Sequence, residues 1–417
     1  MSRWRWAAAK ISKQLWARAT FIGLLGITTA ILAAVVERFI PWELPTTIGA
    51  DAVDNILGII ASSMLAVTTF SLSVMISAYG SATSNVTPRA TKLLIEDSVS
   101  QTVLSTFIGS FLFSIVGIIV LKTGMYGERG RFILFIVTIA VIALIVVSLL
   151  RWIDHLTRLG RVGETTQRVE DATLNALRAW REQPYLGGSP MLVDESFDRA
   201  VDIPADGIGY VQFIDMNALS KIAERLQGAI YIHSVPGAFV FPQTRLAQFL
   251  PDEAGDLNVE ELQEEIRYTF ALARERSFEQ DPRFGLAVMS EIGSRALSSA
   301  INDPGTVIDV IGRMARLLCG WSRGYEESEP LYPRVHVPPL CNEDIFDDAF
   351  ALIARDGAAL VEVQIRLQKT LKALSTMGDE TFRAAAKHQA ELALARAEAA
   401  LTLEADKQRV REIAGLS

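Results

Sequence analysis

The stretch from Ile56 to Tyr79, ILGIIASSMLAVTTFSLSVMISAY, decides the fold of this chain. It is long enough to cross a bilayer, because a membrane-spanning helix needs about 20 consecutive, mostly apolar residues. It is also rich in hydroxyl groups, and at helical spacing one side of it carries a stripe of small side chains. The members of this stripe are Ser62, Ala66, Thr69, Ser73 and Ser77.

Two interpretations of this stripe remain open. In the first, it packs against the third predicted span, whose own small residues are Gly109, Ser110, Ser114 and Gly117. Small residues three and four apart let membrane helices approach closely, which makes packing the leading interpretation. In the second, several copies of the chain assemble and the hydroxyl groups line a polar pathway, because a pore needs no charged lining.

Hydropathy predicts four spans, and the stripe lies on the second of them. The spans run from about Ala19 to Val36, Ile56 to Tyr79, Val103 to Leu121 and Phe132 to Leu150. No Asp, Glu, Lys, Arg or His lies near the middle of any span. Proton relays and antiporters usually place ionisable groups at that depth, so the sequence argues against both.

Lys and Arg are distributed unevenly around the spans. Cytoplasmic loops carry an excess of these residues, which predicts that both termini lie in the cytoplasm. The acidic loop from Pro41 to Asn55 then lies outside, and Thr87-Pro88 starts a helix on the inside. The inner side holds Arg3, Arg5, Lys10, Lys13, Arg18, Arg89, Lys92, Arg151, Arg158, Arg161 and Arg168, and the outer side holds Arg38, Lys122, Arg129 and Arg131.

The remainder of the chain is polar and acidic. The sequence has 417 residues, 50% of them hydrophobic, and a net charge of −8. The apolar excess lies in residues 1–150, so the acidic surplus belongs to the rest and argues against nucleic acid as a partner. The lipid bilayer is the first expected partner. The two cysteines, Cys319 and Cys341, have no CxxC spacing and are expected to be reduced.

The C-terminal part is predicted to be mainly helical with one small β unit. The β-like region contains the alternating stretch GYVQFID (209–215) and a Pro236-Gly237 turn. YPRVHVPPL (332–340) is predicted to be an extended connector. Long helices are predicted over 257–277, 342–372 and 379–413.

The predicted fold class is therefore an α-helical polytopic membrane protein with four transmembrane helices and a mainly α, α+β cytoplasmic domain containing a small β unit. Its predicted divisions are a four-helix transmembrane domain (1–155), a helical connector (156–199), a small β unit with one helix (200–252) and a helical cytoplasmic domain (253–417).

One stretch of the cytoplasmic part contains two Asp-Pro pairs. Asp281-Pro282 and Asp303-Pro304 each have the pattern of an N-capping residue followed by proline at the first helical position. A helix N-terminus can also hold an anion, which is the functional alternative. The candidate cytoplasmic motif is made up of Asp281, Pro282, Ser298, Asn302, Asp303 and Pro304.

Signatures of catalysis are missing from the sequence. It has no GxxxxGK[ST] phosphate loop, no GxGxxG, no HExxH and no GxSxG. Its four histidines are scattered without metal-ligand spacing. His155, beside Asp154 at the end of the fourth span, is either a pH sensor or, as we expect, a solvated interfacial residue. We therefore expect no catalytic residue, no metal, no cofactor and no enzyme activity.

Three stretches resemble a family of predicted bacterial inner-membrane proteins that is classed as a domain of unknown function. They are TTFSLSVMISAYGSATSNVTPRATKLLIEDSVSQTVLSTFIGSF (68–111), VPGAFVFPQTRLA (235–247) and FEQDPRFGLAVMSEIGSRALSSAINDPGTVIDVI (278–311). The family usually reads ALSPxINDP in the last stretch, where this chain has Ser299 in place of the proline. It also tends to carry a Gln-rich, SSQ-like run where this chain has SATSN before Thr87. The resemblance implies a multi-pass protein of the bacterial inner membrane and brings no established activity.

Two functional hypotheses follow. The first is an oligomeric, channel-like or transport protein that the cytoplasmic domain gates, with ions or a small ligand as further partners. The stripe on the second span motivates it. The second is a membrane-anchored sensor or scaffold that binds a small ligand or a protein through the cytoplasmic domain. The two Asp-Pro helix starts and the β unit motivate it.

Overall fold

The structure of the chain is a computed structural model that describes residues 11–12, 14–36, 50–191, 199–253 and 257–415. The contacts divide it into two units. Of the described residues, the membrane unit holds those within 11–84 and 91–165, and the C-terminal unit holds 85–90 and those within 166–415. The predicted four-part division stays a prediction. The N-terminal basic residues Arg3 to Lys10, Lys13, Arg38 and most of the predicted acidic loop lie outside the described residues.

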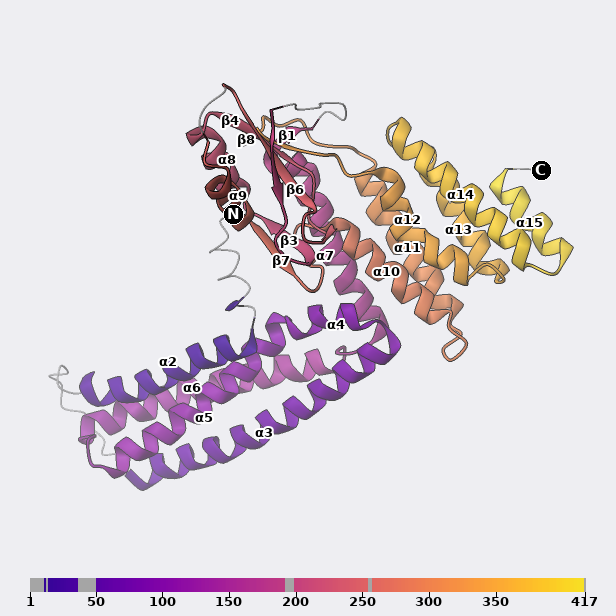
Figure 1. Cartoon of the computed structure of the whole chain (residues 1–417). Coiled ribbons are helices and arrows are strands. Elements are labelled where there is room, and N and C mark those ends of the chain that lie inside the picture. Colours follow the sequence, from indigo (N-terminus) through magenta and orange to yellow (C-terminus); the bar gives the residue numbers. More distant parts are fainter. Residues whose placement is uncertain (1–10, 13, 37–49, 192–198, 254–256, 416–417) are drawn as a thin grey trace. The chain divides into compact units, whose positions relative to one another are not determined.

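Among its described residues, the membrane unit contains four helices that are long and apolar enough to cross a bilayer (Figure 1). A short helix, α4 (Pro88–Ile95), follows the second of them. This pattern and the mixed C-terminal unit confirm the predicted fold class. The four long helices are α2 (Leu15–Val36), α3 (Ala50–Asn85), α5 (Ser98–Lys122) and α6 (Glu128–Leu156).

Small residues bring α2 and α5 together. A Cβ atom added to Gly26 would lie 2.6 Å from the carbonyl oxygen of Gly109, so the two backbones approach as only glycine permits. Gly117, one of the small residues predicted to meet the second span, does face that span, because an added Cβ atom would lie 3.1 Å from Leu57 Cδ1 of α3. The small face of α5 therefore meets the first span at Gly109 and the second span at Gly117.

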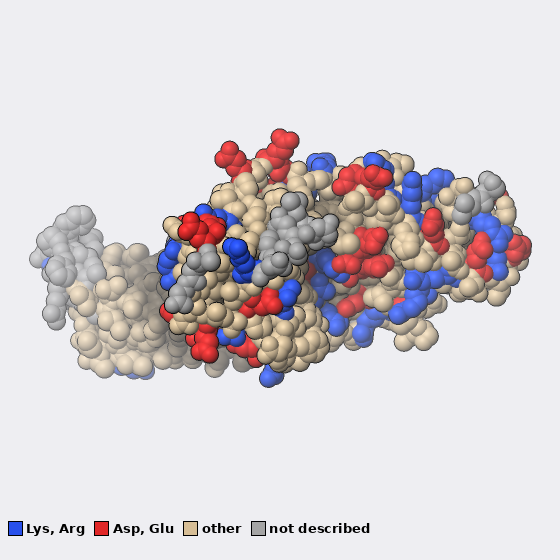
Figure 2. Space-filling model, turned by 45° about the horizontal axis from the view of Figure 1, so that its top comes forward, with Lys and Arg blue, Asp and Glu red and all other residues tan. Residues whose placement is uncertain are grey.

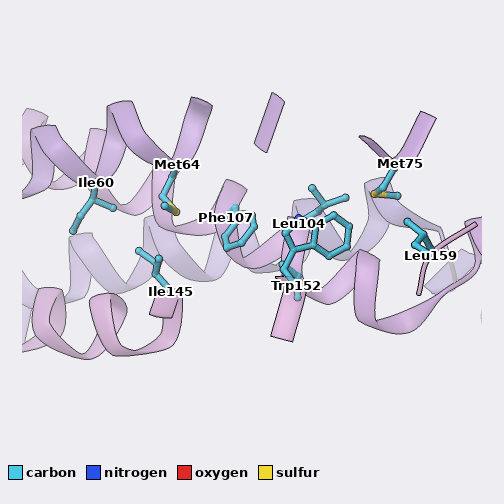
Figure 3. Packing of buried hydrophobic residues seen from close by; sticks show 9 residues of the cluster. Ile60, Met64, Met75, Leu104, Phe107, Ile145, Trp152 and Leu159 are labelled. Carbon is cyan, nitrogen blue, oxygen red and sulfur yellow. The ribbon is translucent and has the colours of Figure 1, made fainter. Parts of the chain in front are cut away.

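The face of α3 that packs inside the membrane unit is apolar. Ile60, Met64 and Met75 are buried against α5 and α6, where they meet residues such as Phe107 and Trp152 (Figure 3). Leu57 belongs to a second cluster with Phe113 of α5. The stripe predicted to pack on α5 lies on the opposite side of α3, and all five of its members are exposed. The expectation that the stripe packs against the third span of the same chain is therefore wrong.

The described residues of the C-terminal unit form two small sheets. The larger has the strand order β1-β8-β4-β6-β2, and the smaller has the order β5-β3-β7. In the larger sheet β8 pairs in parallel with β1 and β4, whereas the β4–β6 and β2–β6 pairs are antiparallel. The strands are β1 (Gly188–Pro190), β2 (Val201–Pro204), β3 (Gly209–Ile214), β4 (Gly228–Ile232), β5 (Phe239–Val240), β6 (Arg245–Pro251), β7 (Phe270–Ala273) and β8 (Tyr332–Val337).

Two of these strands differ from the sequence-based expectation. The stretch predicted to be an extended connector forms β8, a central strand of the larger sheet, with Val335 and Val337 buried. The helix predicted to reach residue 277 ends at Tyr268, because the next residues form β7 and pair with β3. In both cases pairing with a distant strand overrides the local pattern.

Helices make up the rest of the C-terminal unit, and two of the predicted long helices are interrupted. The breaks follow Asp356 and Ala400. The chain also turns after α6 at Gly160, whose φ of +78° is left-handed. The segments are α7 (Val162–Glu182), η2 (Pro184–Gly187), α8 (Met216–Arg225), α9 (Val259–Tyr268), α10 (Pro282–Ala296), α11 (Pro304–Trp321), α12 (Asn342–Asp356), α13 (Val361–Leu374), α14 (Glu380–Ala400) and α15 (Glu404–Ala414).

Charge distinguishes the surfaces of the two units. Lys, Arg, Asp and Glu side chains are spread over the C-terminal unit, whereas the visible part of the membrane unit is almost free of them (Figure 2). The lipid environment explains this difference, because placing a charged side chain in the hydrocarbon core of a bilayer costs much more free energy than leaving it in water.

Candidate functional site

Residues 85–90, which we name the interspan segment, run from the last residue of α3 into the first turn of α4, yet their contacts assign them to the C-terminal unit. The predicted helix start is present here, since α4 begins at Pro88 directly after Thr87. Val86, Thr87 and Ala90 are buried. A stretch of chain between two spans is therefore built into the other unit.

Glu291 of α10 holds the interspan segment by two hydrogen bonds. The Thr87 hydroxyl donates to Glu291 Oε2 over 3.0 Å, and Arg89 Nη1 donates to the same oxygen over 2.9 Å. The Glu291 side chain is 25% exposed and that of Arg89 is 58% exposed. Because an ionised acceptor strengthens a hydrogen bond, one carboxylate fixes the start of α4.

A cavity of about 700 Å³ adjoins these contacts. Two of its charged groups pair with each other: the Arg355 guanidinium donates to Asp356 over 2.7 Å, and the Ser294 hydroxyl donates to the same carboxylate. The hydrogen bond from Arg355 lowers the pKa of Asp356 below its ordinary value, so this carboxylate is ionised at neutral pH. The rest of the lining is Val86, Thr87, Pro88, Arg89, Glu291, Arg295, Leu297, Ser298 and Leu352.

The two Asp-Pro pairs start two different helices. Asp281 caps α10 by accepting from Phe284 N over 3.1 Å, and Asp303 caps α11 by accepting from Thr306 N over 3.0 Å. Pro282 and Pro304 each occupy the first turn of their helix. Asp281 lies at the start of the 15-residue helix α10, whereas the Asp303 amide bonds to Ala296 at its other end, a helix length of about 22 Å at 1.5 Å per residue. The structure therefore does not bring the two carboxylates into one site.

The other residues of the predicted motif form the turn between α10 and α11. The Asn302 amide donates to Ser298 O over 2.8 Å, and the Asp303 amide donates to Ala296 O over 2.8 Å. Asn302 has a φ of +49°, a left-handed conformation that asparagine tolerates better than most residues. Of the motif, only Ser298 lines the cavity beside the interspan segment. A role for this turn in binding stays a prediction.

The stripe on α3 satisfies most of its polar groups within its own helix. The hydroxyls of Ser62, Thr69 and Ser73 donate to backbone carbonyls three or four residues earlier, at distances from 2.9 to 3.1 Å. A hydroxyl satisfied in this way does not require water. The exposed stripe therefore suits lipid or a neighbouring copy as well as a polar pathway.

His155 is not the solvated residue that the sequence suggested. Its side chain is 12% exposed, and its Nε2 lies 2.9 Å from Asp97 Oδ2. The same carboxylate oxygen accepts from the Ser100 amide and from the Ser100 hydroxyl, each over 2.7 Å. The Trp152 ring stacks on the imidazole at 5.8 Å. Asp97 thus ties the start of α5 to the end of α6, a contact between distant residues that no local pattern indicates.

Metal binding finds no support among the described residues, in which no three His, Cys, Asp or Glu side chains gather to hold an ion. The expectations that the protein has no cofactor and is not an enzyme stay predictions.

Four apolar spans joined to a mixed α/β unit define the chain as a multi-pass membrane protein. Residues 12–373 match the model of a family described as predicted membrane protein (DUF2254), and this match covers most of the chain. The chain belongs to that family. No curated protein and no solved structure matches it. The resemblance to a membrane family of unknown function is thereby confirmed, whereas the INDP-type motif and the bacterial inner membrane stay predictions.

Proposed function

We propose that this protein is an oligomeric, channel-like membrane protein of the bacterial inner membrane, and that its C-terminal unit gates the spans. The observation that carries the proposal is the double hydrogen bond from Thr87 and Arg89 to Glu291. The distribution of Lys and Arg supports a cytoplasmic position for both termini and for the C-terminal unit.

The interspan segment is the proposed point of control. It continues directly from the end of α3 and leads through α4 into α5. A rearrangement of α10 at Glu291 therefore reaches two spans through a few residues of backbone. Switching proteins commonly use such an arrangement, in which a local change in contacts biases an element with two packings.

Assembly of several copies would use the stripe on α3. Its small side chains are exposed along one chain, and small faces let membrane helices of neighbouring subunits pack closely. Ions or small solutes would then pass beside the hydroxyl groups of the assembled α3 helices. Hydroxyl groups that bond to their own backbone can rotate outward to meet an ion.

Replacing Glu291 by alanine is expected to loosen the interspan segment. The Thr87 hydroxyl and the Arg89 guanidinium lose a charged acceptor. Because Arg89 is half in solvent, we expect a cost of about 1.4 kcal/mol, or about tenfold in local opening. Hydrogen–deuterium exchange of the full-length protein should show about tenfold faster exchange over residues 85–95.

The matched control is Arg355→Ala, which removes a charge from the same cavity. Among the ion pairs of the described residues, Arg355 pairs only with its neighbour Asp356. It should leave exchange in the interspan segment unchanged. Unaltered exchange in Glu291→Ala, or an equal effect in both variants, would remove the proposed control point.

Replacing Ser73 by leucine is expected to reduce or abolish conductance. The larger side chain would project from the stripe into the proposed pathway. Purified protein in planar bilayers, tested with several ions and tensions, measures this change. The control is Ala143→Leu, which adds the same side chain to an exposed position of α6. If bilayers with the unaltered protein stay silent, or if both variants behave alike, the channel proposal fails.

The second candidate function is a membrane-anchored sensor or scaffold. What favours it is that the C-terminal unit contains cavities of the size that small molecules occupy. A ligand that binds this unit should raise the unfolding temperature of the full-length protein. A broad ligand screen without any thermal shift, together with pull-downs that recover no partner, would leave this candidate without support.

A further inference from the structure

A groove of about 750 Å³ runs along the C-terminal unit between α7, α11 and α13. Leu177, Leu317 and Trp321 contribute to its floor and are buried. Leu174, Leu374 and Met377 continue the apolar lining. The volume falls within the range of about 300–1,000 Å³ that is typical of small-molecule sites, and such sites are mostly apolar with a few polar groups.

Positive charge surrounds this apolar floor. Six basic residues line the groove against two acidic ones, in a chain whose net charge is −8. One of the two acids, Glu170, is already engaged, because Arg316 and Arg313 both donate to it over 2.7 to 3.0 Å. The basic residues are Arg178, Arg181, Arg316, Arg323, Arg366 and Lys369.

Four of these cations have no carboxylate partner in the described part of the chain. Among the described residues, no acidic side chain lies within 4.0 Å of the charged groups of Arg178, Arg323, Arg366 or Lys369. They come from α7, from the segment after α11 and from α13, so they flank the groove on more than one side. Cations left unpaired around an apolar surface complement a ligand that is itself part apolar and part anionic.

We infer that this groove binds a small organic anion with an apolar body, such as an aromatic or aliphatic phosphate. The apolar body lies on Leu177, Leu317 and Trp321, and the anionic group lies among Arg178, Arg366 and Lys369. Both parts are needed, because the apolar floor contributes burial and the guanidinium groups supply charge-assisted hydrogen bonds. The inference rests on the sensor candidate, to which it gives a site and a ligand class. It is independent of whether the spans conduct.

Cys319 allows occupancy of the groove to be measured directly. It lines the groove and is exposed, and the second cysteine, Cys341, is exposed outside the groove. A Cys341→Ser variant of the full-length protein therefore reports only on Cys319. The probe is 1-naphthyl phosphate, which carries a phosphate on an aromatic body. Inorganic phosphate and 1-naphthol are the controls, because the first has only the anionic group of the probe and the second has only its aromatic body.

The measurement is the rate of maleimide labelling of Cys319 in lipid nanodiscs. Saturating 1-naphthyl phosphate is expected to slow labelling about tenfold or more, whereas inorganic phosphate and 1-naphthol at the same concentration leave the rate unchanged. Arg366→Gln is expected to raise the Kd of the probe about tenfold, the effect of losing one charge-assisted hydrogen bond. Lys387→Gln, which removes an exposed charge from α14 outside the groove, should leave the Kd unchanged.

Several results would overturn the inference. Labelling that 1-naphthyl phosphate does not slow would show that the groove does not bind this class of ligand. If 1-naphthol alone protected Cys319 from labelling equally well, the site would be purely apolar. If inorganic phosphate alone did so, the site would be purely ionic. Protection by an acidic amphipathic peptide alone would assign the groove to a protein partner. Circular dichroism melting of each variant separates lost binding from lost folding, and conductance is measured separately.

Discussion

Replacing Asp281 by alanine is expected to lower the free energy of unfolding of the C-terminal unit by about 3–5 kcal/mol, the cost of breaking a buried ion pair from one side. The residue is 2% exposed. Arg276 donates to both of its carboxylate oxygens, over 2.7 and 2.9 Å, and the Phe284 amide donates over 3.1 Å. The variant would leave the Arg276 side chain, which is only 20% exposed, without its partner.

The Pro236-Gly237 turn limits how far water can compensate for the missing Asp281 carboxylate. It lies directly against the carboxylate, since a Cβ atom on Gly237 would be 2.7 Å from Asp281 Cγ. Gly237 also has a φ of +96°, which strongly favours glycine. Because the turn closes over the ion pair, water has little room to solvate Arg276 after the carboxylate is removed.

Asp303→Ala is the matched control for Asp281→Ala. Asp303 also caps a helix and precedes a proline, but it is exposed and has no arginine partner in the described part of the chain. Loss of such a cap costs about 1 kcal/mol. Chemical denaturation followed by tryptophan fluorescence compares the two variants with the unaltered protein. Equal losses of stability would show that the buried ion pair adds nothing to the cap.

The pH dependence of the control has a definite sign. Hydrogen bonds from the side chain and then the backbone of Thr306 lower the pKa of Asp303. Its capping contribution is therefore fully present above the ordinary aspartate pKa of about 4 and is lost as the pH falls through the lowered value. The difference in stability between the unaltered protein and Asp303→Ala should disappear in that acidic range.

Replacing Gly285 by alanine is expected to destabilise the C-terminal unit by about 3 kcal/mol, at the upper end of the usual cost of overpacking. Gly285 lies in α10 where this helix meets α7. An added Cβ atom would lie 2.7 Å from Thr173 Cβ and 2.8 Å from its Cγ2. The Cβ of Thr173 is fixed by the backbone, so rotation of the side chain cannot relieve the clash, and the two helices must separate.

Gly312→Ala tests the same substitution without the clash. Gly312 is in the interior of α11, and nothing lies within 4 Å of an added Cβ atom. Alanine is favoured over glycine in a helix by up to about 1 kcal/mol, so this variant should be slightly more stable than the unaltered protein. Thermal unfolding of both variants is the measurement. A destabilised Gly312→Ala would contradict the assignment of the Gly285 effect to close helix packing.

The spans and most helices could be predicted because their signals are local. A run of about 20 apolar residues needs a membrane-spanning helix to satisfy its backbone in lipid. The starts at Asp281-Pro282 and Asp303-Pro304 follow from residue types at adjacent positions. Strand β8 could not be predicted as a central strand, because its place depends on pairing with β1 and β4, which lie far away in the sequence.

The candidate sites show the same limit. Thr87 and Glu291 are 204 residues apart, and neither has a neighbouring pattern that indicates the other. The pair of Asp97 and His155 is hidden in the same way. The cations of the groove come from helices that are separated in the sequence and assemble only in the folded unit. A search for catalytic motifs passes over such sites, because none of them contains a signature of contiguous residues.

The interspan segment also affects how the protein is made. The ribosome synthesises Thr87 204 residues before Glu291, which at 5–20 residues per second is roughly 10 to 40 s earlier. The membrane helices therefore emerge with a piece of the C-terminal unit already between them. A fragment that begins at residue 166 lacks this piece, including the buried Val86 and Ala90. We therefore expect completion of the C-terminal unit to depend on earlier insertion of α3 and α5, and we expect a wrongly inserted chain to expose an unfinished domain to quality control.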